Sequence, residues 1–250
     1  MPVLFLAESR LPRVGELLEG GRTIAVVPIG SLEQHGPHLP MGTDSIVAEA
    51  VVREAVRSLG DLDLLVLPTV WFGCSEEHMD FPGTVSLDAG TMMRLVRDLC
   101  SSLARHGVRK VALVNAHGGN TDVLRAVLRE VRRDLGVFAV LFDVWPLIKV
   151  LLRPEDLPEV HAGWVETSIL MTLRPELVGP AGPDEFPERG RRIRLGGRGV
   201  STPWATSDVS RSGVIGYPSA ADPERGREIL RRMAEELAEA LRELDSLELP

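Results

Sequence analysis

The feature that most restricts the fold of this chain is an alternation of short apolar runs with longer segments of helical spacing. Four runs are rich in Val, Leu and Ile: Thr23–Gly30, Leu62–Val70, Lys110–Asn115 and Val137–Asp143. Continuous apolar runs of this length are typical of strands that are buried on both faces. Because they alternate with helical segments, we expect an α/β fold, a three-layer α/β/α sandwich with a mostly parallel central sheet.

The segments expected to cover this sheet have apolar residues at helical spacing. The pattern predicts helices at Ser45–Leu59, Gly90–His106, Thr121–Leu135 and Pro223–Leu244. Thr43 or Asp44 is expected to cap the first of them, because short polar side chains accept hydrogen bonds from the free N–H groups of a first turn.

The pattern is less regular after Trp145. A proline-rich stretch leads to His161–Ser168, which predicts the opening of a short helix that ends near Arg174. Residues 179–215 predict loops with one or two short strands, because Gly, Pro and Arg dominate there without a clear period. No repeat or linker interrupts the sequence, so we expect a single domain over residues 1–250.

Composition excludes several kinds of partner. The net charge of −8 argues against nucleic acid, because binding to phosphates requires a basic surface. No apolar run approaches the roughly 18 residues of a membrane span, and the N-terminus lacks the pattern of a secretory signal. The two cysteines, Cys74 and Cys100, have neither disulfide nor zinc-ribbon spacing. We therefore expect a soluble, cytoplasmic protein that binds neither nucleic acid nor membrane.

Residues that can carry chemistry follow the predicted strands. In parallel α/β sheets, ligands bind outside the carboxyl ends of the strands, so residues that follow the strands meet at one rim. These residues are Glu33, His35 and Asp44 after the first strand, Ser75–His78 after the second, His117 after the third and Trp145 after the fourth.

The few side-chain amides of the chain lie in the same stretches. Gln34 is the only glutamine, and Asn115 and Asn120 are the only asparagines. All three fall inside two short stretches that contain histidines. This concentration indicates that these stretches have a chemical role.

The types of residue at this rim point to metal ions. Glu33 and His35 stand at i and i+2, which in extended backbone directs both side chains to the same side. Oxygen and nitrogen ligands without a thiolate suit Zn²⁺, Mn²⁺ or Fe²⁺. With Glu33, Asp44 and Glu166 ionised, the three carboxylates and one bridging hydroxide would balance two divalent ions in a partly dry site. The structural alternative is that Glu33 and Asp44 are only a loop anion and a helix cap.

A longer pattern resembles the creatininase (creatinine amidohydrolase) family. The first motif is Pro28–Asp44, which reads PIGSLEQHGPHLPMGTD. The resemblance runs from about residue 24 to residue 170, with a weaker match at Gly213–Gly216. Further motifs are Glu77-His78 with Phe81–Thr84, then Asn115–Asn120 (NAHGGN), then His161–Gly163 with Glu166–Ser168.

The resemblance implies an α/β/α sandwich with two divalent ions per chain (Zn, Mn or Fe) that hydrolyses a non-peptide or cyclic amide C–N bond. It also implies a homo-oligomer such as a hexamer. Glu33 and His117 resemble ligands of one metal, His35 resembles a ligand of the other, and Asp44 resembles the bridging carboxylate. His161 matches a histidine that protonates the leaving nitrogen in this family.

One position departs from creatininase itself. There the segment that matches 117–120 reads His-Tyr-Glu-Asn and its Glu is a ligand, whereas this chain has Gly119. In this motif the chain is more similar to relatives with His-Gly-Gly-Asn, which include a formamidopyrimidine-nucleotide deformylase and a peptidase of the mycofactocin precursor. We expect Glu166 to replace the missing ligand. The alternative is a carboxylate that is merely favoured near a helix N-terminus.

The expected reaction is hydrolysis of a small-molecule amide by a metal-bridging hydroxide. His161 and Glu166 are the expected catalytic residues, and His78, Trp145 and Trp164 are the expected substrate contacts, although a buried Trp is also common in a core. Residues 145–165 and 179–215 are expected to form the walls of the pocket.

Other functions stay open at this point. Within the same family, the chain could be a formamide deformylase or a peptidase. A catalytically silent scaffold stabilised by metal is an alternative of another class. A hydrolase using Ser31 or Cys74 is less supported, because no G-x-S-x-G motif is present. A nucleotide-binding module lacks a P-loop or G-x-G-x-x-G motif.

Overall fold

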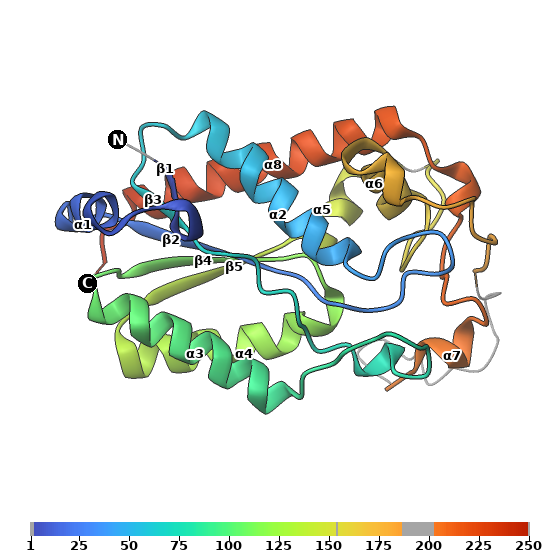
Figure 1. Cartoon of the computed structure of the whole chain (residues 1–250), viewed down its shortest axis with the longest axis horizontal. Coiled ribbons are helices and arrows are strands. Elements are labelled where there is room, and N and C mark those ends of the chain that lie inside the picture. The colour runs from blue at the N-terminus through green and yellow to red at the C-terminus, as the bar shows by residue number, and fades with distance from the viewer. Residues whose placement is uncertain (1–2, 154, 187–202, 250) are drawn as a thin grey trace.

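A five-stranded parallel sheet forms the centre of the molecule (Figure 1). The computed structural model describes residues 3–153, 155–186 and 203–249. The strand order is β1-β3-β2-β4-β5, and each neighbouring pair is parallel. The predicted α/β class is therefore confirmed. The strands are β1 (Val3–Phe5), β2 (Ile24–Ile29), β3 (Leu64–Val66), β4 (Lys110–Asn115) and β5 (Phe138–Asp143).

Helices cover both faces of this sheet and complete three layers. Side chains of β2 alternate between two cores: Ile24 and Val26 pack toward one helical layer, whereas Ala25 and Val27 pack toward the other. Burial on both faces explains why this strand is a continuous apolar run. One layer holds α2 (Thr43–Ala55), α5 (Val144–Leu151), α6 (Trp164–Leu173) and α8 (Pro223–Ser246), and the other holds α3 (Ala89–Arg105) and α4 (Thr121–Leu135) (Figure 1).

Strand β1 and two helices before Trp164 are absent from the sequence prediction. Strand β1 has only 3 residues, which is too short to give a periodic signal. Helix α1 (Leu11–Glu19) follows it at the same end of the chain. Helix α5 contains Pro146 in its first turn, where proline is tolerated because the N–H groups of that turn have no partner within the helix.

The predicted cap of the first long helix is wrong. Helix α2 has Gly42 at its N-cap, and neither Thr43 nor Asp44 caps it with a side chain. The Thr43 hydroxyl instead donates to the carbonyl of Pro40, 2.7 Å away. The Asp44 carboxylate accepts a hydrogen bond from the Ser31 hydroxyl at 2.6 Å. Asp44 therefore faces the loop that follows β2 rather than the N–H groups of its own helix.

The region predicted to hold loops and short strands is only partly described. Residues 187–202 lie outside the described residues. In the rest of this region, α7 (Thr206–Val209) is the helical element, and Glu185 forms an isolated bridge with Gly216 rather than a strand. None of the helices in the described part of the chain combines the length and apolar character needed to cross a membrane.

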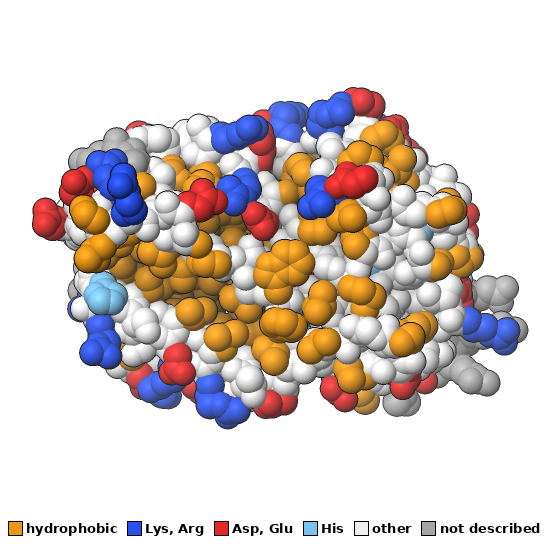
Figure 2. All heavy atoms as spheres, viewed as in Figure 1, with side chains coloured by type: hydrophobic (Ala, Val, Ile, Leu, Met, Phe, Trp, Pro, Cys, Tyr) orange, Lys and Arg blue, Asp and Glu red, His pale blue; other side chains and the backbone are white. Residues whose placement is uncertain are grey.

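Charged and apolar side chains occupy different parts of the face shown in Figure 2. Charged side chains lie mainly around the outer edges of this face, and apolar side chains gather across its middle. Trp71 and Phe72, in the loop after β3, are among the exposed large apolar residues.

Candidate metal centre

The carboxyl ends of β2 and β4 bring the first group of predicted site residues together. The two strands are neighbours, and Ile29 at the end of β2 pairs with Asn115 at the end of β4. The loop after β2 carries Glu33 and His35, and His117 follows β4 directly. Gly30 allows the start of α2 to approach this loop, because a Cβ there would lie 2.4 Å from the Ser45 nitrogen.

Asp44 connects two clusters of ligand-type side chains. Its Oδ2 lies 3.2 Å from His117 Nδ1, which lies 3.2 Å from Glu33 Oε2. Its Oδ1 lies 3.3 Å from His35 Nε2, which lies 3.4 Å from Glu166 Oε1. All five side chains are buried. We call Glu33, His117 and Asp44 Oδ2 the Glu33 cluster, and His35, Glu166 and Asp44 Oδ1 the Glu166 cluster.

Backbone carbonyls orient the histidine of each cluster. His35 Nδ1 lies 3.2 Å from the carbonyl of Glu33, and His117 Nε2 lies 2.8 Å from the carbonyl of Cys74. Since a carbonyl only accepts, each of these ring nitrogens carries a proton and donates it. The other ring nitrogen then faces the carboxylates, which is the usual arrangement of histidines that bind metals.

Several buried polar atoms in these clusters have no hydrogen-bond partner among the described residues. They are both carboxylate oxygens of Glu33, Nε2 of His35 and Oε1 of Glu166. Burial of unpaired charged groups is costly. The donor set contains nitrogen and oxygen without sulfur, and several of its members lie close enough together to hold one ion. The residues present therefore fit divalent ions such as Zn²⁺, Mn²⁺ or Fe²⁺.

The pKa values of these groups reflect strong mutual attraction. Burial alone would lower the pKa of His35, but the carboxylates of Asp44 and Glu166 outweigh burial and raise it well above its ordinary value. Burial would also lower the pKa of His117, but the carboxylates of Glu33 and Asp44 outweigh this effect and raise the pKa well above its ordinary value. At Glu33, burial opposes ionisation, yet His117 lowers the pKa to about 2. The lowered pKa values of Glu33 and Asp44 thus keep these two carboxylates ionised, so that they attract positive charge.

Glu166 is held in place by its own loop. Its Oε2 accepts a hydrogen bond from the backbone N–H of Ala162, which leaves Oε1 directed at His35. Ala162 has a φ of 52°, which is uncommon for a residue with a Cβ. Burial raises the pKa of the Glu166 carboxyl, against the effect of His35. A cation beside Oε1 would therefore favour the ionised form of Glu166.

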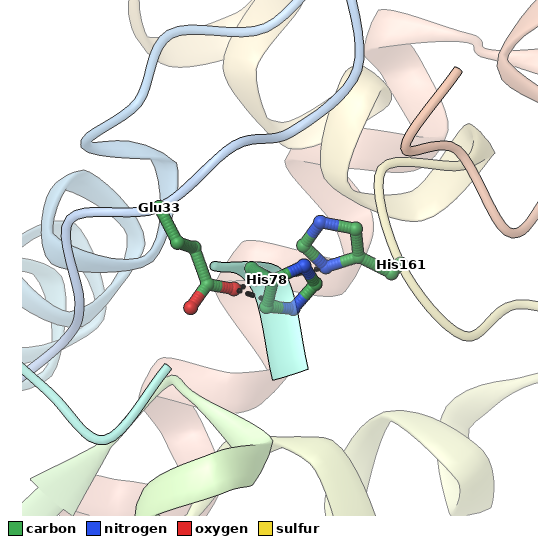
Figure 3. A group of neighbouring side chains, drawn as sticks. All are labelled: Glu33, His78 and His161. Atoms are coloured by element: carbon green, nitrogen blue, oxygen red, sulfur yellow. Dashed lines mark ion pairs between the residues drawn. The ribbon is translucent and has the colours of Figure 1, made fainter. Parts of the chain in front are cut away.

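Two further histidines lie beside Glu33. His78 Nε2 is 3.3 Å from Glu33 Oε1, and His161 Nδ1 is 3.8 Å from the same oxygen. Figure 3 shows the three side chains converging from separate segments of the chain. Burial lowers the pKa of His78 to about 4 and lowers that of His161 well below its ordinary value. Both rings are therefore neutral at pH 7.

A cavity of about 230 Å³ opens onto the Glu33 cluster. Trp145, predicted as a substrate contact, lines it, and its indole nitrogen donates to the carbonyl of Ala116. Trp164 does not line it. Its indole is buried in the core and donates to the carbonyl of Leu157. Other lining residues are Glu77, His78, Glu159, His161 and Trp204.

Sequence reasoning gave no role to three of these lining residues. Glu77 precedes His78 in one of the family motifs, and Glu159 precedes His161 by two positions, so their proximity to predicted site residues is a signal in the sequence. Glu159 accepts a hydrogen bond from the Gly163 N–H, and burial followed by repulsion from Glu166 raises its pKa to about 8. Trp204 has no comparable signal, because it lies in a stretch without periodicity.

Gly119 occupies a position without room for a side chain. A Cβ there would lie 2.2 Å from the carbonyl oxygen of Cys74 and 2.5 Å from His117 Nε2. Such approaches are shorter than real Cβ atoms make. Glycine at position 119 is therefore required by the packing of the loop after β3 against His117.

Contacts of the candidate nucleophiles argue against a serine or cysteine hydrolase. The Ser31 hydroxyl donates to Asp44 rather than to a histidine. His117 contacts the backbone carbonyl of Cys74. Burial raises the pKa of the Cys74 thiol, which disfavours the reactive thiolate.

Known proteins of one family resemble this chain in sequence and in structure. The family model for creatininase, described as creatinine amidohydrolase, matches residues 7–241. The chain belongs to the creatininase family. The creatininase-family protein from Pseudomonas putida named creatinine amidohydrolase is 28% identical over 266 residues, which cover 96% of each chain. A crystal structure of creatinine amidohydrolase has a TM-score of 0.82 and 27% identity, and the match covers 99% of this chain and 100% of that one.

A second relative is more similar in sequence to this chain. The mycofactocin precursor peptide peptidase of Mycolicibacterium smegmatis is 35% identical over 232 residues, which cover 88% of this chain and 84% of that protein. The subgroup suggested by Gly119 is therefore represented among the relatives.

Proposed function

We propose that this protein is a two-metal amidohydrolase that cleaves a non-peptide or cyclic amide C–N bond. The observation that carries the proposal is the pair of buried clusters that share Asp44. In each cluster one histidine nitrogen lies 3.2–3.4 Å from two carboxylate oxygens of different residues. We assign Glu33, His117 and Asp44 to one ion and His35, Glu166 and Asp44 to the other.

Names given to solved relatives support metal ions at this centre. One creatininase structure is described as a manganese form and another as a Zn-Zn type. Bound at the Asp44 clusters, divalent ions would polarise the amide carbonyl and activate a water molecule. The identity of the metals in this chain and their number are part of the proposal.

The remaining steps fall to side chains of the chain itself. We assign His161 as the group that takes a proton at Nδ1 and delivers it to the leaving nitrogen, because this nitrogen faces Glu33 and the cavity. Its other ring nitrogen is fixed by the carbonyl of Gln34 at 2.7 Å. Trp145 and Trp204 form apolar walls that exclude water beside a planar amide.

A peptidase of the same family is the second candidate. It is favoured by the 35% identity to the mycofactocin precursor peptide peptidase, compared with 28% to the creatinine amidohydrolase. It is also favoured by Gly119, which this subgroup shares. We propose a panel of creatinine, an N-formyl aminopyrimidine and a peptide that releases a C-terminal dipeptide. The substrate with the largest kcat/KM assigns the branch of the family.

The assignment of Glu166 is tested by Glu166→Gln, which keeps the size and removes the charge. We expect this variant to hold one ion per chain instead of two, measured by elemental analysis. We expect the rate of hydrolysis to fall at least about tenfold, because replacing even a residue that only hydrogen-bonds a metal ligand reduces activity by that factor. The matched control is Glu176→Gln, an exposed glutamate in the short turn after α6.

Two results would contradict the proposal. Full activity of a metal-free preparation after chelation would exclude a metal-dependent reaction. Glu166→Gln with both ions at wild-type occupancy would exclude Glu166 as a ligand. If the metals are present but no amide is cleaved, the alternative of a metal-stabilised scaffold is favoured.

We also propose a homo-oligomer, with a hexamer as the first state to test. The apolar side chains that gather on one face support a partner there (Figure 2), and Trp71 and Phe72 are exposed by 40% and 44%. Light scattering of the purified protein measures the mass directly. A monomer at micromolar concentration would contradict this proposal.

A further inference from the structure

Gln34, the only glutamine of the chain, is buried between two cavity histidines. Its Oε1 accepts a hydrogen bond from the Gly36 N–H at 2.9 Å, and its Nε2 donates to the Gly213 carbonyl at 3.1 Å. A backbone N–H only donates and a backbone carbonyl only accepts. These two partners therefore fix which end of the amide is oxygen and which is nitrogen.

The side chain of Gln34 determines the proton position on His78. One hydrogen of Gln34 Nε2 points to Gly213, and the other is directed at His78 Nδ1, 2.8 Å away. Because the amide nitrogen is a donor, His78 Nδ1 must accept, so the neutral ring carries its proton on Nε2. That N–H faces Glu33 Oε1 at 3.3 Å. Thr206 Oγ1 also contacts His78 Nδ1, at 2.9 Å.

The backbone carbonyl of Gln34 determines the proton position on His161, and there the ring nitrogen that faces Glu33 is the one without a proton. His161 Nε2 lies 2.7 Å from the Gln34 carbonyl oxygen, so this nitrogen carries the proton. The lone pair of the neutral ring is then on Nδ1, which faces Glu33 Oε1. The 3.1 Å contact between Gln34 Nε2 and His161 Nε2 joins two donors and is therefore not a hydrogen bond.

We propose that Gln34 is a positioning residue that sets opposite tautomers on the two cavity histidines. His78 presents an N–H to the cavity edge, and His161, whose ring centre lies 4.2 Å away, presents a lone pair. The N–H of His78 faces Glu33 Oε1 at 3.3 Å, whereas Glu33 Oε2 lies 3.2 Å from His117 Nδ1 in the Glu33 cluster. The lone pair of His161 is ready to accept a proton. The chemical use of this pair rests on the proposed hydrolase function, but the tautomers themselves do not.

Neutron diffraction from deuterated crystals tests the proton positions directly. In the wild-type protein, both as purified and loaded with Zn²⁺, we expect deuterium on Nε2 of His78 and on Nε2 of His161. Deuterium on Nδ1 of His78, or on Nδ1 of His161 instead of Nε2, would overturn the proposal. Because no substrate is needed, this outcome is independent of whether the protein cleaves amides.

Gln34→Glu separates the side-chain effect from the main-chain effect. A carboxylate only accepts, so we expect His78 to move its proton to Nδ1, while His161 keeps its proton on Nε2. We expect kcat/KM to fall by about 10- to 100-fold, as for other partners of metal-site residues. An unchanged proton on His78 Nε2 would overturn the proposal. In that variant a merely structural role would alter stability without moving this proton.

Two further variants control this comparison. Thr206→Val removes the hydroxyl that also contacts His78 Nδ1, and since a hydroxyl can donate or accept, we expect the wild-type tautomer to remain. Gln34→Met avoids placing a carboxylate beside the Gly213 carbonyl if Gln34→Glu folds poorly. It removes the amide donor, and we expect deuterium on both nitrogens of His78 in partial occupancy. Full occupancy on Nε2 alone in Gln34→Met would show that Gln34 is not the determinant.

Discussion

The two clusters that share Asp44 are built in different ways. The Glu33 cluster comes from the ends of β2 and β4, which are adjacent in the sheet and in register. The Glu166 cluster needs a side chain from α6, a helix that packs against α8 and α2 in an outer layer. The first cluster is therefore a consequence of strand order, whereas the second depends on how a later loop and helix dock. This difference predicts that the two clusters respond separately to substitution.

The largest effect is expected from Asp44→Asn, which affects both clusters at once. The substitution removes the charge that faces both His35 and His117. We expect loss of both ions by elemental analysis and a fall in activity of roughly 10²- to 10³-fold, the cost of losing a preorganised charge. Asp122→Asn is the matched control, because Asp122 also stands in a first helical turn but is exposed. If Asp44→Asn retained both ions, Asp44 would not be a shared ligand of the two clusters.

Gly119→Ala should affect the Glu33 cluster alone. The added Cβ would lie 2.5 Å from His117 Nε2 and displace that ring, while His35 and Glu166 are left in place. We expect selective loss of one ion and an activity loss of about 10- to 100-fold. Gly118→Ala is the control, since a Cβ at Gly118 meets nothing within 4 Å. Equal loss of both ions in Gly119→Ala would mean that the clusters are not separable.

Metal binding should weaken as the pH falls, because protons compete for the same histidine nitrogens. His35 and His117 have pKa values raised well above 6.5, so the metal-free protein holds them protonated at pH 7. Each must lose one proton to bind an ion, which gives about a tenfold loss of affinity per proton and per pH unit. Calorimetry in buffers of different ionisation enthalpy should count one proton per cluster. Absence of proton release would contradict the assignment of His35 and His117 as ligands.

The same shifts predict how the metal-free fold responds to pH. A raised histidine pKa contributes stability that is complete below the ordinary value of 6.5 and is lost as the pH rises through the raised values. We therefore expect the difference in melting temperature between metal-loaded and metal-free protein to increase with pH above neutrality. Thermal unfolding measured with and without a chelator checks this.

The smallest effect on the hydrolytic activity is expected from substitution of a tryptophan in the cavity wall. Trp204→Ala should raise KM about fivefold, corresponding to an aromatic contact of about 1 kcal/mol, without changing metal content. Trp164→Ala should instead destabilise the fold by about 3–5 kcal/mol, because Trp164 is part of the core. Chemical denaturation and steady-state kinetics separate the two. A change of KM in Trp164→Ala at full stability would restore its predicted role as a substrate contact.

The sequence predicted the parts of the molecule that depend on strand order. The runs that became β2, β4 and β5 are long enough to give a pattern, and the residues after them meet at one rim because parallel strands end there. The choice of Glu166 required a comparison of motifs, since no periodicity relates α6 to the sheet. The assignment of these residues as ligands, the single domain over residues 1–250 and the cytoplasmic location stay predictions.

The sequence could not predict contacts that depend on how loops pack. Trp145 and Trp164 look equivalent as buried aromatic residues in the sequence, yet one lines the cavity and the other fills the core. The role of Gln34 depends on contacts with Gly213 and Thr206, which lie far away along the chain. Such contacts leave no local pattern, because they arise only when the segments after α6 fold back over the strand ends.

The lack of space at residue 119 also bears on how ligand sets are exchanged during evolution. A glutamate introduced there in one mutational step would meet the Cys74 carbonyl before it reached an ion. We therefore expect a glutamate at this position to be tolerated only together with a shift of the loop after β3. The residue at 119 and the position of that loop are coupled, so a change of ligand set on this fold would involve both.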